Sequence, residues 1–232
     1  MHILKMGQVG GGIGAFIGAV HRRAARMDGG IVLTAGAFDV VPEKSLKQGK
    51  LLGLDPKRVY ATYQEMIAGE LALPPEERID FVSVCTPNHT HYPIAKACIK
   101  AGFNVMCEKP MTLTVKEALD LEALVKKTGV VFGLMHNYTA YPMVKLAKDM
   151  IKKGDLGKLR KVVVQYPQGW LWQLLEKTGQ MQASWRTNPK TSGAAGSMGD
   201  IGTHAANLAE YITGLKITEV LADLTAFVKG RK

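Results

Sequence analysis

The stretch ILKMGQVGGGIGAFIGAV (residues 3–20) decides the fold. An apolar run typical of a buried strand leads through glycines into helical spacing. We expect Gly10 to make the tight turn, Gly12 to let a pyrophosphate approach the backbone, and Ala15 to take the small third position where helix packs on strand. The N–H groups and dipole of the helix start favour phosphate. The stretch predicts a dinucleotide site, with a purely structural glycine turn as the alternative. The predicted binding residues here are Gly10, Gly12, Ile13 and Gly14.

Further apolar runs alternate with helical patterns along the first part of the chain. They are IVLTAGAF (31–38), FVSVC (81–85), NVMC (104–107) and VVFGLM (130–135). Before the last of them, TVKE (114–117) has the form of a capping box, and Gly129 is a natural helix stop. Such alternation is typical of parallel strands joined by crossover helices. The sequence predicts an α/β fold whose residues 1–137 form a Rossmann domain with a doubly wound parallel sheet.

The pattern changes in residues 138–232. KLRKVVVQY (158–166) and ITEVLADLTAFV (217–228) predict strands, and DIGTHAANLAEYITG (200–214) predicts a helix. Two strands are too few for a self-sufficient sheet. We therefore expect the start of an α+β substrate and oligomerisation domain that is incomplete in this chain.

Composition narrows the class of protein. The 232 residues are 47% hydrophobic, with a formal net charge of +10 and three cysteines that form no Cys-x-x-Cys pair. The basic residues are dispersed and no aromatic residues interleave with them, so we expect no nucleic acid partner. No apolar run approaches the roughly 20 residues of a membrane helix. We expect a protein of the reducing cytoplasm, with neither a disulfide framework nor a metal site.

An acid follows the second predicted strand. Asp39 is expected to accept hydrogen bonds from an adenosine ribose and to repel the 2′-phosphate of NADP, which favours NAD, with NADP as the alternative. The other interpretation, compatible with the first, is an Asp that caps the helix starting near Pro42. If NADP were bound, a basic residue such as Lys44 would have to hold the phosphate.

Three other polar stretches carry candidate chemistry. The loop TPNHTH (86–91) leaves a strand at the edge where such sheets bind cofactors, so its residues are predicted to line the crevice. EKP (108–110) leaves the next strand, where solvated charges are the simple alternative. In GDIGTH (199–204), Asp200 and His204 are expected to share one helix face. They are predicted either to contact a ligand or to be a helix-capping Asp and a half-buried His. The loop residues predicted to bind are Thr86, Pro87, Asn88 and His91.

In this order, the glycine turn, TPNHTH, EKP and GDIGTH resemble the Gfo/Idh/MocA oxidoreductases along the whole chain. The resemblance implies an NAD(P)-binding Rossmann domain, a second α+β domain with a large open sheet, and oxidation or reduction of sugars, inositols and related polyols. It also implies that Lys109 meets Asp200 and His204 around the substrate, beside the nicotinamide, with Glu108 and Lys109 also at the cofactor. Pro110 is expected to stiffen that turn.

The chemistry needs a base for a hydroxyl proton. His204 suits that role because imidazole titrates near neutral pH, Lys109 would polarise the reacting oxygen, and Asp200 would orient the substrate or the imidazole. Two alternatives remain: an NAD-dependent glycoside hydrolase of the same fold, and a non-catalytic dinucleotide-binding protein. The flanking candidates for substrate contact are His136, Tyr138, Trp185, Arg186 and Lys190.

The family's chains are usually longer than this one. We therefore expect residues 1–232 alone to bind cofactor and turn over poorly, and a full-length protein to form a homo-oligomer, a dimer or a tetramer.

Overall fold

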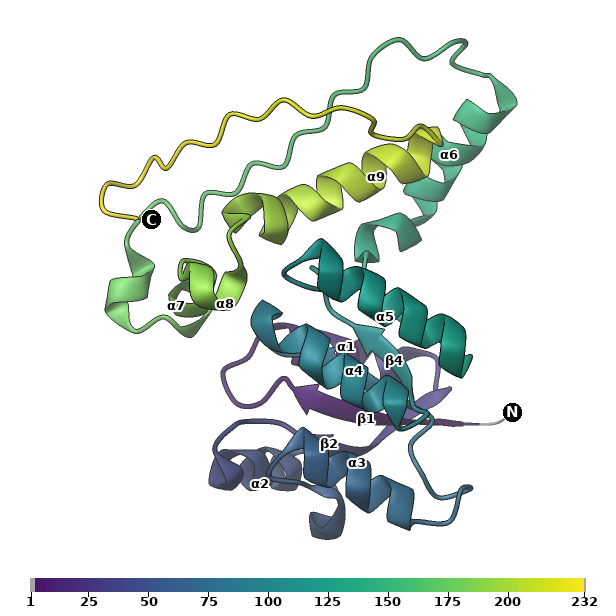
Figure 1. Cartoon of the computed structure of the whole chain (residues 1–232), viewed down its shortest axis with the longest axis vertical. Helices are drawn as coiled ribbons and strands as arrows, with labels where there is room; N and C mark the ends of the chain where they lie inside the picture. Colours follow the sequence, from purple (N-terminus) through teal and green to yellow (C-terminus); the bar gives the residue numbers. More distant parts are fainter. Residues whose placement is uncertain (1–2, 232) are drawn as a thin grey trace. The chain divides into compact units, whose positions relative to one another are not determined.

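The computed structural model describes residues 3–231 (Figure 1). The chain divides between Leu134 and Met135 into two compact units, which are described separately below. No helix of the described chain is long and apolar enough to cross a membrane.

The first unit is built on five parallel strands in the order β2-β1-β3-β4-β5. Every strand predicted in this part of the sequence is present, which confirms the α/β class and the doubly wound sheet. The order reverses direction between β1 and β3, so the crevice outside the carboxyl ends of these two strands is where such sheets bind ligands. The strands are β1 (Leu4–Gly10), β2 (Ile31–Ala37), β3 (Phe81–Cys85), β4 (Asn104–Cys107) and β5 (Phe132–Leu134).

Helices cross from each strand to the next. The predicted capping box is present at the start of α5, where Thr114 and Glu117 exchange hydrogen bonds with backbone N–H groups, and Gly129 ends that helix in the left-handed conformation. In Figure 1, α4 and α5 pack side by side over the sheet. The helices are α1 (Ile17–Met27), α2 (Pro42–Leu51), α3 (Tyr63–Ala72), α4 (His91–Lys100) and α5 (Val115–Thr128), with short 3₁₀ turns η1 (Pro56–Arg58) and η2 (Asn88–Thr90).

Helix α1 approaches the sheet very closely. A Cβ added at Gly18 would lie 2.4 Å from Gly11 Cα and 3.1 Å from Gln8 Nε2. Only glycine permits this distance, and it lets the start of α1 face the glycine turn. The small residue that packs helix against strand is therefore Gly18, one turn beyond the Ala15 expected from the sequence.

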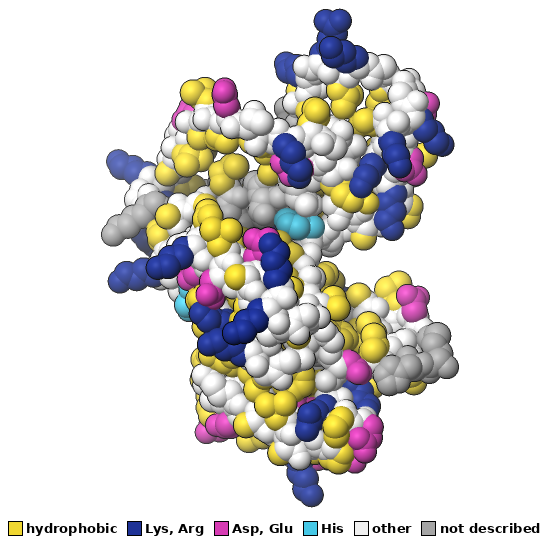
Figure 2. Space-filling view, turned by 45° about the vertical axis from the view of Figure 1, so that its right-hand side comes forward, with side chains coloured by type: hydrophobic (Ala, Val, Ile, Leu, Met, Phe, Trp, Pro, Cys, Tyr) yellow, Lys and Arg dark blue, Asp and Glu magenta, His cyan; other side chains and the backbone are white. Residues whose placement is uncertain are grey.

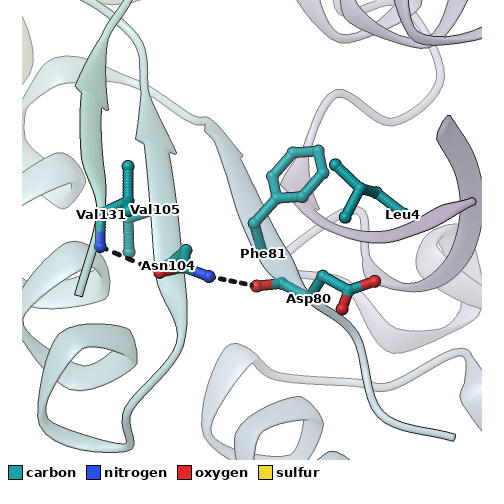
Figure 3. A pocket seen from close by; sticks show the side chains of 6 residues that line it. All are labelled: Leu4, Asp80, Phe81, Asn104, Val105 and Val131. Carbon is teal, nitrogen blue, oxygen red and sulfur yellow. Dashed lines mark hydrogen bonds between the residues drawn. The ribbon is translucent and has the colours of Figure 1, made fainter. Parts of the chain in front are cut away.

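One side chain joins the amino ends of three strands (Figure 3). Asn104 Nδ2 donates to the carbonyl oxygen of Asp80 at 2.8 Å, and Asn104 Oδ1 accepts from the Val131 N–H at 2.9 Å. These bonds fix where β3, β4 and β5 begin. The surrounding shallow pocket has a volume of about 290 Å³ and lies at the sheet edge opposite the predicted ligand loops. It is lined by Leu4, Asp80, Phe81, Asn104, Val105 and Val131.

The second unit is helical where it has regular structure. Helices α6 and α9 pack against each other, with Lys148 Nζ 3.9 Å from the centre of the Tyr211 ring. Near the end of the chain, the Arg231 guanidinium bonds to Glu176 and to the carbonyl oxygens of Leu171 and Gln173. The elements are η3 (Asn137–Ala140), α6 (Pro142–Lys153), η4 (Leu175–Thr178), α7 (Met181–Arg186), α8 (Pro189–Ser192), a π-helical turn η5 (Met198–Gly202) and α9 (Thr203–Thr213).

The two strands predicted in this unit are wrong. Residues 158–166 and 217–228 run as long segments without a strand ladder (Figure 1). Their apolar side chains remain exposed, as at Val163 (65%), Leu221 (101%) and Phe227 (94%). A strand is stabilised by pairing with neighbouring strands. The apolar pattern of a segment shows which side chains a sheet would bury, but it does not supply the neighbouring strands. The helix predicted over 200–214 is present, preceded by the π-helical turn that carries Asp200.

The Asn104 bridge yields a stability prediction. In Asn104→Asp, the carboxylate still accepts from Val131 N–H but cannot donate to the Asp80 carbonyl, and it brings charge next to that oxygen. We expect the free energy of unfolding of the first unit to fall by about 1–3 kcal/mol in denaturant titrations at pH 7. Gln64→Glu, an exposed amide-to-acid change in the same unit, is the control and should stay within about 0.5 kcal/mol of the parent. If Asn104→Asp and the parent are equally stable, the Asn104 hydrogen bonds do not stabilise the first unit.

The close approach of α1 to the glycine turn gives a second stability prediction. Alanine has a higher helix propensity than glycine by about 1 kcal/mol, so Gly18→Ala would stabilise an open helix. Here overpacking against backbone atoms dominates, and we expect a net loss of about 1–3 kcal/mol and a lower melting temperature. Gly133→Ala is the matched control, because a Cβ at Gly133 meets nothing within 4 Å. A Gly18→Ala protein as stable as the parent would contradict the close approach.

Candidate functional site

The glycine turn forms a cradle that side chains would fill. Gly10 has φ +79°, and a Cβ there would lie 2.7 Å from both the Cys85 carbonyl oxygen and Thr86 Cγ2. A Cβ on Gly12 would lie 2.7 Å from the Phe38 carbonyl oxygen. The Ala15 N–H donates to the Gly12 carbonyl at 3.0 Å and closes the turn, leaving Ile13 and Gly14 exposed. Gly10 and Gly12 thus let the turn pack closely against the loops after β3 and β2, and the exposed part of the turn ahead of α1 is Ile13 and Gly14.

Asp39 lies beside this turn. Its Cβ is 3.7 Å from the position of a Cβ on Gly12. Asp39 Oδ1 accepts from the Val41 N–H at 2.9 Å, whereas α2 starts at Pro42 with Val41 as its N-cap and no side-chain cap. The carboxylate therefore stabilises the turn before α2 rather than capping the helix, and it stands at the edge of the glycine cradle.

The loop after β3 forms the opposite wall. Thr86 Oγ1 is buried and has no hydrogen-bond partner among residues 3–231, and Asn88 is buried. A buried hydroxyl without a partner, next to a glycine cradle, is what a polar ligand would satisfy.

His91 has a different position from the one expected. Its ring is 1% exposed, with Nδ1 2.7 Å from the Pro110 carbonyl oxygen and Nε2 2.8 Å from that of Thr86. Burial, the stronger effect, lowers the pKa of His91, although two carbonyl acceptors favour the protonated ring. The side chain thus lies beneath the loop and ties it to the EKP turn, and any part it has in binding is indirect.

The EKP turn is held from several sides. The Glu108 N–H donates to the Val84 carbonyl at 3.1 Å, and Glu108 Oε2 accepts from the Lys109 N–H at 3.1 Å. Glu108 Oε1 is 2.8 Å from His21 Nε2, and the Lys109–Pro110 peptide is cis. The residues predicted from "EKP" are therefore part of an ordered turn at the carboxyl edge of the sheet.

His21 was missed by the sequence reasoning. It is 5% exposed on α1, with Nδ1 2.9 Å from Ser83 Oγ and 3.3 Å from Cys85 Sγ. Burial disfavours its charged form, but the bonds to Cys85 and Glu108 outweigh burial and raise the pKa of His21 to about 10. The available signal was its spacing, since His21 follows Gly18 by three residues and shares the buried face of α1.

The next residue on α1 holds the glycine turn. Arg22 Nη1 donates to the Gly11 carbonyl at 2.9 Å and to Gln8 Oε1 at 2.7 Å. Two consecutive residues of α1 therefore fix two different loops of the candidate site.

A cluster of rings in the second unit surrounds His204. The His204 side chain is buried, with its ring centre 4.7 Å from that of Tyr138 and 5.8 Å from that of His136, both edge to face. The Tyr138 hydroxyl bonds to the Tyr166 hydroxyl, and this bond, together with burial, raises the pKa of Tyr138 to about 12. Three predicted residues thus come together, and Tyr166 joins them from residues 158–166, where the sequence predicts a strand.

A second group in this unit is centred on Arg186. Its Nε donates to Asp200 Oδ2 at 3.2 Å, and its guanidinium carbon lies 4.1 Å from the centre of the Trp185 ring. Lys190 is exposed on the short α8, where its N–H donates to Asn188 Oδ1. The contacts bring together Trp185, Arg186 and Asp200.

Neither the surface charge nor the metal-ligating residue types point to a further binding site. On the face in Figure 2, Lys and Arg side chains lie in several small groups among hydrophobic and acidic ones rather than in one stripe. Within residues 3–231, no three His, Cys, Asp or Glu side chains are arranged to hold a metal ion.

Comparisons with known proteins agree with this geometry. Residues 5–136 match the family described as an oxidoreductase family with an NAD-binding Rossmann fold, Gfo/Idh/MocA, and residues 144–232 match the Gfo/Idh/MocA C-terminal domain. The oxidoreductase YfiI of Bacillus subtilis is 36% identical over 230 residues, which are 98% of this chain and 58% of YfiI.

Solved structures give the same result. An inositol dehydrogenase homolog from Azotobacter vinelandii complexed with NAD⁺ is similar with a TM-score of 0.87 and 36% identity, over 92% of this chain and 54% of that one. The same homolog complexed with NADH and myo-inositol has a TM-score of 0.84 and 35% identity, over 92% and 53%. The chain thus spans somewhat more than half the length of these relatives. With an NAD-binding Rossmann domain followed by the matching C-terminal domain, it belongs to the Gfo/Idh/MocA family of oxidoreductases.

Proposed function

We propose that this protein is a dehydrogenase that transfers a hydride between NAD and a CH–OH group of a sugar, an inositol or a related polyol. The observation that carries the proposal is that the Lys109 turn leaves β4 at the same sheet edge as the glycine turn and is fixed there by Glu108, His21 and His91. A similar chain, the Azotobacter homolog, is complexed with NADH and myo-inositol.

The first unit has the groups that a dinucleotide requires. Gly10 and Gly12 allow the close packing of the turn, and the start of α1 would face the pyrophosphate with N–H groups. Asp39 would bind the ribose hydroxyls, and the unsatisfied Thr86 hydroxyl fits a polar ligand against the second wall. NAD supplies the hydride acceptor when bound. The remaining proposed cofactor contacts are Ile13, Gly14, Pro87, Asn88, Glu108 and Lys109, with His91 acting through its loop.

The proposed chemistry uses one base and one cation. His204 would take the hydroxyl proton as the general base, a role that imidazole fills more often than any other side chain. Lys109 would donate to the reacting oxygen as it gains negative charge. Asp200, paired with Arg186, would orient the substrate. The proposed substrate contacts around these groups are His136, Tyr138, Trp185, Arg186 and Lys190.

We propose residues 1–137 as the cofactor domain and 138–232 as part of the substrate domain of a cytoplasmic homo-oligomer. Two other functions stay open: NAD-dependent glycoside cleavage, in which NAD is regenerated, and dinucleotide binding without turnover. Net NADH production from a polyol favours the dehydrogenase over both.

Asp39 gives a prediction about cofactor choice. In fluorescence titrations the parent should bind NADH more tightly than NADPH, because the carboxylate bonds the ribose and repels a 2′-phosphate. Asp39→Ala should shrink this preference by about tenfold or more. Asp55→Ala is the control, since Asp55 Oδ1 accepts from the Lys57 N–H at 2.9 Å in a matching local bond away from the cradle. A parent that prefers NADPH would contradict the role of Asp39.

Lys109 and His204 give a prediction about turnover. Lys109→Ala and His204→Asn should each lower kcat by about 10² or more with NADH affinity nearly unchanged, because each removes a group from the chemical step. The double variant should lose little more than the worse single variant. Absorbance of NADH measures kcat of the full-length enzyme with its best polyol, and melting temperatures report folding. Lys116→Ala, an exposed lysine on α5, is the control. A near-normal kcat in Lys109→Ala would contradict the catalytic role of Lys109 and favour solvated charges at the end of β4.

A further inference from the structure

We propose that His21 is a positioning residue that holds the Glu108–Lys109 turn in the conformation that receives the cofactor. The inference rests on the proposed function in taking this turn to face NAD. It concerns contacts within the first unit, so it is testable by cofactor binding alone.

The bonds form an uninterrupted path from α1 to Lys109. Ser83 Oγ fixes His21 Nδ1 at 2.9 Å, and His21 Nε2 meets Glu108 Oε1 at 2.8 Å. The other carboxylate oxygen, Oε2, accepts from the Lys109 N–H at 3.1 Å. Both oxygens of Glu108 therefore have assigned partners, one on α1 and one on the turn itself. Rotation of the carboxylate would break both bonds.

A Ser-His-Glu sequence of bonds also occurs in nucleophilic catalysis, and the burial here argues against that role. Ser83 is 0% exposed in the interior of β3, and Cys85, the other nucleophile at the ring, is 6% exposed. Neither can meet a substrate in this structure. The Glu108 side chain is 12% exposed, so the end of the network nearest solvent is the carboxylate of the EKP turn.

Charge makes the contact stronger. The titratable and charged groups facing His21 are Cys85 from β3 and Glu108 after β4, with Arg22 beside it on α1. The raised pKa of His21 keeps the ring protonated at neutral pH, and a charge-assisted bond is stronger and shorter than a neutral one. Removal of the donor at the Nε2 position would leave the largely buried Glu108 carboxylate without its partner on α1, which favours movement of the turn.

Two amide substitutions separate the two sides of the ring. A Gln side chain is long enough to place an amide nitrogen near the position of Nε2 and keep a bond to Glu108. An Asn side chain is shorter, so it reaches Ser83 and leaves Glu108 without its donor. His21→Gln and His21→Asn both remove the charge of the ring and a similar amount of packing. They therefore differ chiefly in whether they keep the hydrogen bond to Glu108.

The experiment measures NADH affinity by fluorescence titration of the folded proteins, with melting temperatures in parallel. We expect His21→Asn to raise the Kd for NADH about tenfold or more, and His21→Gln to stay within about threefold of the parent. Glu70→Gln is the matched control, because it removes the charge from a buried ion pair with Arg58 elsewhere in the unit. It should lower the melting temperature without changing the Kd.

A second readout is the His21 ring itself. In NMR titrations its Cε1–H shift should stay constant from pH 5.5 to 8.5 in the parent, because the raised pKa keeps the ring protonated. Glu108→Gln removes one of the causes of the raised pKa, so the pKa of His21 should fall; a His21 pKa unchanged by this substitution would contradict the contact.

Parental Kd in both His21 variants, or equal weakening in both, would overturn the positioning role, as would a parent that does not bind NADH. A parent that binds NADH but oxidises no polyol would contradict the proposed function and leave this comparison intact.

Discussion

The close contact between α1 and the end of β1 is the constraint on which the rest of the first unit depends. Gly18 and Gly11 bring the helix to a distance at which no Cβ fits. This places the N–H groups at the start of α1 in front of the glycine turn, and it brings His21 and Arg22 within bonding distance of groups at the carboxyl ends of the strands. A helix a few ångströms farther out would lose all three relationships.

The three loops of the candidate cofactor site are held by hydrogen bonds from side chains on or next to helices. Arg22 fixes the Gly11 carbonyl, His21 fixes the Glu108 carboxylate, and His91 ties Thr86 to Pro110. Such supporting bonds keep a binding site in one geometry before the ligand arrives, which reduces the entropy that binding must overcome. In the second unit, the rings of Tyr138 and Tyr166 pack against His204, the proposed base.

Local signals predicted the first unit well because its elements are defined by neighbours in sequence. The strands at 81–85 and 104–107, the capping box at Thr114 and the stop at Gly129 each follow from residue type and spacing. The supporting contacts were not predictable in this way, since His21 bonds to Glu108 across 87 positions and nothing local marks the pair. The strands expected at 158–166 and 217–228 failed for the same reason, because pairing depends on partners that the pattern itself does not contain.

The proposed function requires that NAD bound at the glycine turn receives a hydride from a polyol carbon. The most direct test is isotope transfer by the full-length protein: it is incubated with NAD⁺ and perdeuterated myo-inositol, then with other perdeuterated polyols and sugars, and the dinucleotide is analysed by mass spectrometry. The account predicts that reduced dinucleotide accumulates with one deuterium at nicotinamide C4, in step with loss of the polyol. Cofactor that binds but acquires no deuterium from any of these compounds would contradict it.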